Sequence, residues 1–328
     1  MKFWTDEIKE EILKLFKSKK GEYLSGRDLS ERFKVSRTAV WKKIKFLKES
    51  GYRIEASPRR GYRLIGAPDL LLPAEVKHGL NTEILGREIH HFLEVSSTID
   101  IARDLAVQGH LEGTLVVAET QKAGRGRLGR TWFSPPGGLW FSLILRPDIP
   151  PVDAPKITFL MAVAGAKGIE AQTGLATKIK WPNDILIEGK KVGGILCEID
   201  AEPDRVIFAV LSLGLNVNVD LSGLPAEIRA QVSTLKEVQG KVVNRVKLLQ
   251  SILENLEDDY LQVKKGDFSS TLSQWKDRSE TLGRDVRIST PHGLFEGRAR
   301  DIDEHGALVL KLSSGETKAF ASGDATLL

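Results

Sequence analysis

The sequence is poor in cysteine and has no long apolar run. One Cys in 328 residues excludes an intramolecular disulfide framework and a cysteine-rich zinc site. No stretch approaches the about 18 consecutive apolar residues of a membrane-spanning helix. Residues 1–16 carry acidic side chains and no uninterrupted apolar core, unlike a signal peptide. These absences predict a soluble, cytoplasmic protein that is not bound to a membrane.

The composition is that of a folded protein with more than one domain. Hydrophobic residues make up 41% and charged residues 28%, which excludes disorder along the whole chain. Because domains usually span about 100–200 residues, this length predicts two or three of them.

Charge is distributed unevenly along the chain. The net charge is +4, yet residues 1–66 hold 18 Lys and Arg against 9 Asp and Glu. The remaining residues hold 30 and 35, so they are slightly acidic. This asymmetry predicts a basic module with a polyanionic partner, the alternative being a solvated basic surface.

The basic module has the pattern of a winged helix. Amphipathic spacing predicts helices at residues 6–16, 25–33 and 36–50, and alternation predicts a hairpin of strands 52–55 and 62–65. Apolar and basic positions of the third helix segregate onto opposite faces, which favours DNA binding over a small helical domain for protein contacts. The predicted DNA-binding residues are Ser36, Arg37, Thr38, Lys42, Lys43, Arg59 and Arg60.

The rest of the chain predicts an α+β fold. Residues 67–280 alternate strand-like and helix-like segments, indicating a central mixed sheet with helices on one face. From residue 283, short alternating runs separated by glycine turns indicate a small β-barrel of about five strands, which could equally be a structural cap. The predicted domains are 1–66, 67–280 and 281–328.

A glycine- and arginine-rich stretch lies at residues 121–132. Its glycines match G-x-G-x-x-G, but the Trp-Phe-Ser-Pro-Pro that follows cannot open the helix of a dinucleotide site. No H-R-D or D-F-G follows, which excludes a protein kinase, and the P-loop pattern is absent. Glycines let the backbone close over a ligand and arginines reach phosphate oxygens, so the stretch predicts phosphate binding. A solvated basic turn and an RNA-binding tract are the alternatives.

Two further stretches carry polar residues at strand ends. In KWPND (180–184), Asp184 could hold Mg²⁺ or orient an amine, and Lys191 could meet an anionic substrate group. GLNVN (214–218) ends a strand with two amides. Each of these residues taken alone could be purely structural.

Together these motifs carry a family resemblance. Ser97-Thr98, Gln121, GRGRLGRTWFS (124–134), KWPND, KKVGGILCE (190–198) and GLNVN occur in the order seen in biotin–protein ligases. The resemblance covers essentially the whole chain. With a winged helix in front, the chain is similar to the bacterial bifunctional type, which also represses biotin biosynthesis.

The resemblance implies a two-step reaction. Biotin attacks the α-phosphate of ATP to give biotinoyl-5′-AMP, and a lysine of the biotin carboxyl carrier protein then takes the biotinoyl group. It also implies Mg²⁺, operator DNA as a partner, biotinoyl-AMP as corepressor and a homodimer when liganded. The C-terminal segment would be an SH3-like domain that aids ATP and carrier-protein binding.

The resemblance also implies roles for individual residues. Catalytic residues would be Lys191, Arg125, Arg127 and Asp184, and Asp184 would also help to bind Mg²⁺. Biotin would be bound by Ser97, Thr98, Gln121, Arg125, Gly126, Arg127 and Lys191. ATP would be bound by Arg125, Arg127, Arg130, Trp132, Asn183, Asp184 and Asn216. The family usually has a polar residue where this chain has Ile99, so a backbone contact is implied there rather than a side-chain contact.

Two other functions fit the same pattern. A ligand-sensing transcription regulator would bind biotin without ligase turnover. A lipoate-type ligase would share the fold, although the KWPND and GRGRLGR motifs favour biotin.

Overall fold

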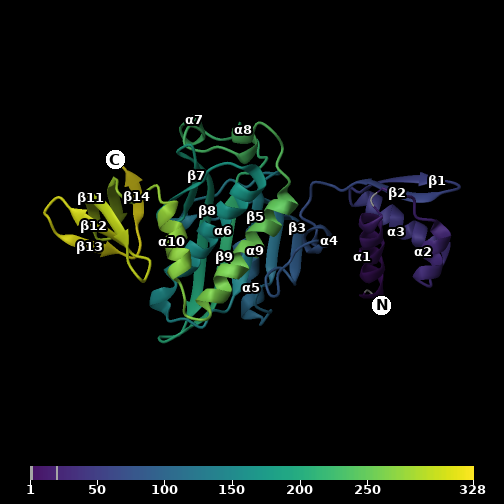
Figure 1. The fold of residues 1–328 in the computed structure, drawn as a ribbon, viewed down its shortest axis with the longest axis horizontal. Helices are drawn as coiled ribbons and strands as arrows, with labels where there is room; N and C mark the ends of the chain where they lie inside the picture. The colour runs from purple at the N-terminus through teal and green to yellow at the C-terminus, as the bar shows by residue number, and fades with distance from the viewer. Residues whose placement is uncertain (1–2, 20) are drawn as a thin grey trace. The chain divides into compact units, whose positions relative to one another are not determined.

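The computed structural model describes residues 3–19 and 21–328. These form two compact units that divide between His78 and Gly79, and each is described by itself. Figure 1 shows their elements in chain order. Among the described residues, no helix combines the length and apolar character needed to cross a membrane.

The first unit is the predicted helix-turn-helix with a β-hairpin wing. Its elements are α1 (Phe3–Ser18), α2 (Gly26–Arg32), α3 (Arg37–Glu49), β1 (Arg53–Ser57), β2 (Gly61–Gly66) and α4 (Pro73–Lys77). Ser36 caps α3, because its side-chain oxygen accepts a hydrogen bond from the backbone N–H of Ala39. The first helix begins at Phe3 rather than at residue 6, so it is longer than the apolar pattern indicates.

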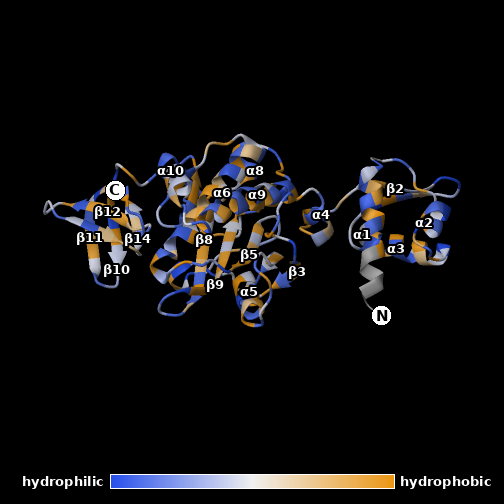
Figure 2. Ribbon diagram, turned by 60° about the horizontal axis from the view of Figure 1, so that its bottom comes forward, coloured by the Kyte–Doolittle hydropathy of each residue, from blue (hydrophilic) through white to orange (hydrophobic). Residues whose placement is uncertain are grey.

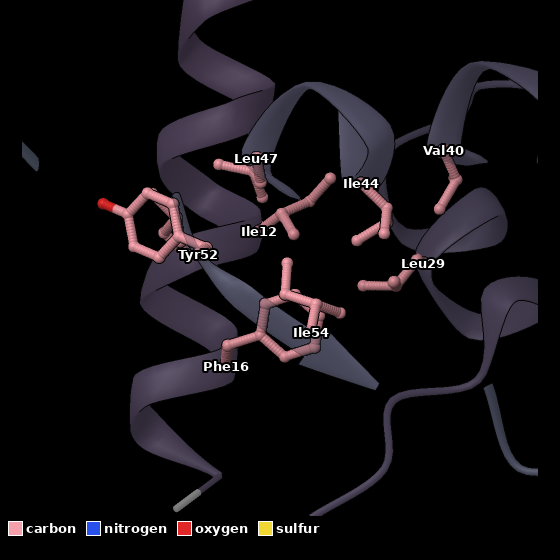
Figure 3. Close-up of a cluster of buried hydrophobic side chains, with 9 residues drawn as sticks. Ile12, Phe16, Leu29, Val40, Ile44, Leu47, Tyr52 and Ile54 are labelled. Carbon is pink, nitrogen blue, oxygen red and sulfur yellow. The ribbon is translucent and has the colours of Figure 1, made fainter. Parts of the chain in front are cut away.

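Three helices and the first strand of the wing share one apolar core in this unit. Figure 3 shows the side chains converging from these elements. Its buried residues include Ile12, Phe16, Leu29, Val40, Ile44, Leu47, Tyr52 and Ile54. Burial of this set fixes α3 against α1 and α2 and leaves its other face to solvent.

The short helix α4 belongs to the first unit. Glu75 accepts a hydrogen bond from the Tyr52 hydroxyl at 2.7 Å and forms an ion pair with Lys17 at 2.9 Å. These side-chain contacts place residues 67–78 with the first unit, whereas the sequence assigns them to the second domain. The boundary between residues 66 and 67 stays a prediction.

The second unit is built on a seven-stranded mixed sheet. Its order is β3-β4-β5-β9-β8-β7-β6, with β3 and β4 parallel and the other pairs antiparallel. The strands are β3 (Ile89–Val95), β4 (Leu115–Gln121), β5 (Leu139–Leu145), β6 (Lys178–Lys180), β7 (Asp184–Ile187), β8 (Lys190–Ala201) and β9 (Val206–Leu215). Figure 2 shows hydrophobic residues concentrated on the central strands.

Helices cover this sheet unequally. The main layer holds α6 (Pro155–Thr173), α9 (Arg245–Val263) and α10 (Ser269–Asp277). It packs on the side of β9 from which Leu213 projects, because a Cβ at Gly165 of α6 would lie 3.7 Å from the Leu213 side chain. The helix α5 (Thr98–Val107) packs with Val210 instead. Because alternate residues of a strand face opposite sides, α5 lies on the other face. The helices α6, α9 and α10 therefore lie on one face of the sheet, as predicted, whereas α5 lies on the opposite face.

Shorter helical turns connect these elements. They are η1 (Arg127–Gly129), η2 (Pro151–Asp153), α7 (Ala226–Arg229) and α8 (Leu235–Gln239). Both α7 and α8 lie in the segment between β9 and α9, which borders the cavity described below.

The C-terminal residues form a five-stranded antiparallel sheet. Its strands are β10 (Asp285–Thr290), β11 (Gly293–Ile302), β12 (Leu308–Leu312), β13 (Thr317–Phe320) and β14 (Asp324–Leu327), in the order β13-β12-β11-β10-β14. Ion pairs join it to the rest of the unit, among them Asp301 with Lys276 at 2.6 Å and His305 with Asp153 at 3.0 Å. The predicted number of strands is confirmed.

Candidate active site

A cavity of about 720 Å³ lies in the second unit and gathers the sequence motifs. Its walls come from the central sheet, the loop after β4, the α7 segment and β14. Every residue predicted to contact biotin or nucleotide lines it, namely Ser97, Thr98, Gln121, Arg125, Gly126, Arg127, Arg130, Trp132, Asn183, Asp184, Lys191 and Asn216. The fold thus brings together residues that are 119 positions apart in the sequence, from Ser97 to Asn216.

One wall holds a chain of hydroxyl and amide groups. Gln121 Oε1 accepts hydrogen bonds from the Thr98 backbone N–H at 2.8 Å and from Thr98 Oγ1 at 3.1 Å. The buried Ser142 hydroxyl donates to Thr98 Oγ1, and Gln121 Nε2 donates to Ser134 Oγ, both at 2.9 Å. Each member of this hydroxyl–amide chain therefore donates a hydrogen bond to the next. The members are, in order, Ser212, Ser142, Thr98, Gln121, Ser134 and the Trp132 carbonyl.

The glycine- and arginine-rich loop folds over the cavity as a tight double turn. Gly126 N–H donates to the Arg130 carbonyl at 2.7 Å, and Trp132 N–H donates to the Gly124 carbonyl at 2.8 Å. A Cβ at Gly124 would lie 2.4 Å from the Trp132 carbonyl oxygen, so only glycine fits there. Exposed Leu128 takes a left-handed φ of 55° at the loop tip.

Different partners hold the three loop arginines: carboxylates for Arg125 and Arg130, and a backbone carbonyl for Arg127. Arg125 forms ion pairs of 2.6 Å with both Asp100 and Glu198. Arg130 pairs with Asp324 of β14, and this hydrogen bond lowers the pKa of the Asp324 carboxyl. Arg127 donates to the Gly323 carbonyl at 3.2 Å. The loop is therefore anchored to the C-terminal sheet as well as to the central one.

The Trp132 indole rests on a floor made of glycine. Gly194 of β8 and Gly214 of β9 are paired across the strands, and a Cβ at either would come within 3.0 Å of the indole. Trp132 Nε1 is buried and has no hydrogen-bond partner among the described residues. Lys191 Nζ lies 5.0 Å from the centre of the same ring, a cation–π distance. The motif glycines thus make room for an aromatic platform beside the lysine.

The strand-end residues surround Lys191. Its ammonium lies 2.7 Å from Asp184 Oδ1, and this contact is an ion pair without a well-directed hydrogen bond. Asn183 Nδ2 donates to the Ile195 carbonyl at 2.7 Å, and the buried Asn216 amide donates to the Ser233 carbonyl at 3.2 Å. The two asparagines therefore fix the local backbone while bordering the cavity.

The cavity is positively charged. Six lysines and arginines line it, against two aspartates. Charges in a concave site attract anions of opposite sign and stabilise developing negative charge. The cavity can therefore hold two anionic groups side by side.

Several lining residues were not predicted from the sequence. The α7 segment contributes Leu221, Leu224 and Ile228, and β14 contributes Asp324, Thr326 and Leu327. Neither segment carries a motif, so the sequence offered no signal for them. Ser212 lies opposite Ser142 in the β5–β9 pair, a contact that depends on strand register. Ile99 borders the cavity from an apolar cluster, so its side chain offers no polar contact.

The first unit carries the candidate DNA-binding surface. Arg37, Thr38 and Lys42 of α3 are exposed, Lys43 is half-buried, and Ser36 serves as the helix cap. Arg59 and Arg60 are exposed at the wing turn, where the Arg60 guanidinium lies 4.2 Å from the centre of the Tyr23 ring. The exposed aromatic side chain of Trp41, on the same helix, was not singled out by the sequence patterns.

Comparison with known proteins agrees with this geometry. An HTH domain model matches residues 9–63, the biotin/lipoate A/B protein ligase family matches 93–218, and the biotin protein ligase C-terminal domain matches 281–328. Fold and site thus define a class of biotin/lipoate-type protein ligases that carry a helix-turn-helix domain.

The relatives narrow this class. The bifunctional ligase/repressor BirA of Bacillus spizizenii is 41% identical over 96% of this chain and 97% of its own length. The protein of the same name from Escherichia coli is 28% identical over 94% of each chain. The chain belongs to this family of bifunctional ligase/repressors. A solved structure of the Aquifex aeolicus biotin protein ligase in complex with biotin and ATP matches with a TM-score of 0.64 and 28% identity, covering 74% of this chain and 99% of that one.

Proposed function

We propose that this protein is an ATP-dependent biotin–protein ligase that also represses transcription. The observation that carries the ligase proposal is the cationic cavity, because every residue predicted to contact biotin or nucleotide lines it. Biotin would lie along the hydroxyl–amide chain and ATP beside Trp132. Membership of the bifunctional family supports the pairing of the two functions in one chain.

In the first step the biotin carboxylate attacks the α-phosphate of ATP, and pyrophosphate leaves. Both reactants are anionic, so the approach requires neutralising charge at their meeting point. Lys191 would provide it, with Arg125 and Arg127 closing the loop over the biotinyl chain and phosphate. The product is a mixed anhydride, biotinoyl-5′-AMP.

In the second step a lysine amine of the biotin carboxyl carrier protein attacks the biotinoyl carbonyl carbon, and AMP leaves. Asp184 would orient the amine, and the amine's proton passes to solvent as the amide forms and AMP leaves. The loop would exclude water, which otherwise hydrolyses the anhydride. Nothing in this sequence of steps needs a covalent bond to the enzyme, and burial raises the pKa of the Cys197 thiol to about 12, which makes it a poor nucleophile.

The donor set suits Mg²⁺ that arrives with ATP. Asp184 and the Asn183 amide offer oxygen ligands, and Mg²⁺ typically takes one or two carboxylates plus substrate phosphates. When bound, the ion would shield the phosphate charge. Asp184 already faces Lys191, so the protein itself holds one carboxylate and one ammonium at this point.

The repressor activity would belong to the winged-helix unit. Arg37, Thr38 and neighbouring basic residues of α3 would enter the major groove, while Arg59 and Arg60 would contact phosphates. Biotinoyl-AMP would act as corepressor by ordering the arginine loop and promoting a homodimer that reads two half-sites. We propose that residues 1–66, 67–280 and 281–328 divide these three tasks, with residues 67–78 packed against the first of them and the last assisting ATP and carrier-protein binding.

The ligase proposal is tested with Lys191→Ala. Removing one charge-stabilising donor typically costs about 10²–10³ in rate, so biotin- and ATP-dependent labelling of a carrier domain should fall by that factor. Lys178→Ala, an exposed lysine on β6 outside the cavity, is the matched control. Undiminished labelling by Lys191→Ala would refute its role.

Two measurements separate the alternatives. A sensor that only binds biotin would release no pyrophosphate from ATP in the presence of biotin. A lipoate-type ligase would be inhibited by lipoate at concentrations where biotin has no effect. We expect pyrophosphate release and selective use of biotin.

A further inference from the structure

A second group of ligand-forming side chains lies outside the active-site cavity. His90 Nε2 is 2.7 Å and His110 Nδ1 is 2.9 Å from the same oxygen, Glu88 Oε1. One ligand atom from each residue lies within 4.8 Å of the others, and in the described part of the chain this is the one such group of three. None of the three residues lines the cavity.

The strand side of this group is rigid. His90 lies within β3 and is paired with Val116 of the neighbouring strand. Glu88 immediately precedes the strand, and its carbonyl accepts a hydrogen bond from Leu115 N–H at 2.9 Å. Two of the ligand-forming residues are therefore fixed by the sheet.

Backbone hydrogen bonds also fix the third residue, His110, which follows α5. His110 follows the end of α5, and its N–H donates to the Leu105 carbonyl at 3.0 Å. Arg146 donates to the His110 carbonyl at 3.0 Å, which fixes the backbone and also places a cation nearby. The three residues meet without any rearrangement of the backbone.

A buried hydroxyl lies behind the carboxylate. Thr114 Oγ1 donates to the Leu111 carbonyl at 2.8 Å and lies 3.3 Å from Glu88 Oε2, while Glu88 Oε1 faces both imidazoles. A polar group behind a ligating carboxylate supports its orientation.

Two imidazole nitrogens and one carboxylate oxygen form a donor set for a borderline divalent cation. Mg²⁺ and Ca²⁺ prefer all-oxygen ligands, whereas Zn²⁺ accepts this combination with water in a fourth position. The side chains are 29–37% exposed, so an ion can reach them from solvent.

We propose that Glu88, His90 and His110 bind one Zn²⁺ ion, independently of the ligase reaction. Each imidazole would present to the metal the nitrogen that now faces Glu88 and keep its proton on the other nitrogen. The ion would tie the start of β3 to the segment after α5. Thr98, at the opposite end of α5, lines the active-site cavity, so the bond would brace the helix that carries it.

The test is a Zn²⁺ titration of the full chain in competition with a chromogenic chelator. We expect one equivalent to bind, with affinity lowered at least tenfold in His90→Gln and in His110→Gln. His292→Gln, an exposed histidine in the β10–β11 turn, is the matched control and should bind as the parent does. Zn²⁺ should also raise the Tm of the parent and of the control, and not that of the two variants.

A variant that should still bind the metal separates loss of a ligand from misfolding as the cause of weakened Zn²⁺ binding. His90→Cys keeps three metal ligands, so it should still bind one equivalent and should add a thiolate-to-metal absorption band when loaded with Co²⁺. A folded His90→Cys protein without that band would overturn the proposal. So would undiminished binding of one Zn²⁺ by the double variant His90→Gln/His110→Gln.

Discussion

Two glycines determine where the indole of Trp132 lies. Because Gly194 and Gly214 face each other across β8 and β9, a methyl group at either position enters space that the ring occupies. The KKVGG and GLNVN motifs are therefore two halves of one surface, although they are 20 residues apart in the sequence.

Gly214→Ala should weaken nucleotide binding selectively. Its Cβ would lie 2.5 Å from Trp132 Nε1, so the indole must move from the position beside which ATP is proposed to bind. We expect KM for ATP to rise about tenfold, about 1.4 kcal/mol, with a smaller change in KM for biotin. Gly223→Ala, which meets Phe133 at an ordinary 3.7 Å, should behave as the parent. Equal effects of the two substitutions would contradict the argument.

At the scale of elements, the contact between the arginine loop and β14 is testable. Asp324→Asn removes the charge that holds Arg130, leaving the loop more open to protease. We expect trypsin to cleave after the loop arginines a few-fold faster, as followed by mass spectrometry. Asp301→Asn also breaks an ion pair of the C-terminal sheet, but with Lys276 of α10. If trypsin cleaved the loop equally fast in Asp301→Asn, the cause would be a general loosening of the C-terminal sheet rather than loss of the contact between Arg130 and Asp324.

Local patterns predicted the long elements well. The strand β5 and the helix α6 belong to the strand-like and helix-like alternation predicted for residues 67–280, because a continuous apolar run marks β5 and a glycine follows α6. The helices α7 and α10 escaped prediction because they are short, 4 and 9 residues, which leaves little room for an apolar repeat to show. The site was predictable where residues form motifs, but Ser212 and Asp324 reach it through strand pairing and domain contact, which no local pattern records.

At the scale of the whole molecule, the His305–Asp153 ion pair links the C-terminal segment to the rest of the second unit, and its strength depends on pH. The hydrogen bond to Asp153 raises the pKa of His305 above its ordinary 6.5. This contact stabilises the fold fully below about pH 6.5 and is lost as pH rises through the folded-state pKa.

His305→Gln should therefore lower Tm slightly at pH 6 and leave it unchanged at pH 9. The effect is small because the imidazole is 46% exposed. Melting curves from pH 5.5 to 9 measure it. A Tm difference that does not shrink toward alkaline pH would contradict the assignment.

DNA binding should depend on the ligase site. We expect operator affinity, measured by gel shift at one fixed salt concentration, to increase when biotin and ATP are present together. Arg37→Ala should weaken binding in both conditions and reduce the salt slope by about 1, whereas Lys19→Ala should not. Operator affinity independent of the adenylate would contradict the proposed corepressor role.

The hydroxyl–amide chain gives one wall of the cavity a chemical polarity. Each of its hydroxyl protons is already directed to the next member, ending at a backbone carbonyl. A ligand that approaches the hydroxyls of Ser212 and Thr98 therefore meets lone pairs and must bring its own N–H groups, while the second amide proton of Gln121 can serve a carbonyl oxygen. A ureido ring satisfies both demands, and a dithiolane ring satisfies neither. We therefore expect discrimination between biotin and lipoate to arise from the direction of these five hydrogen bonds.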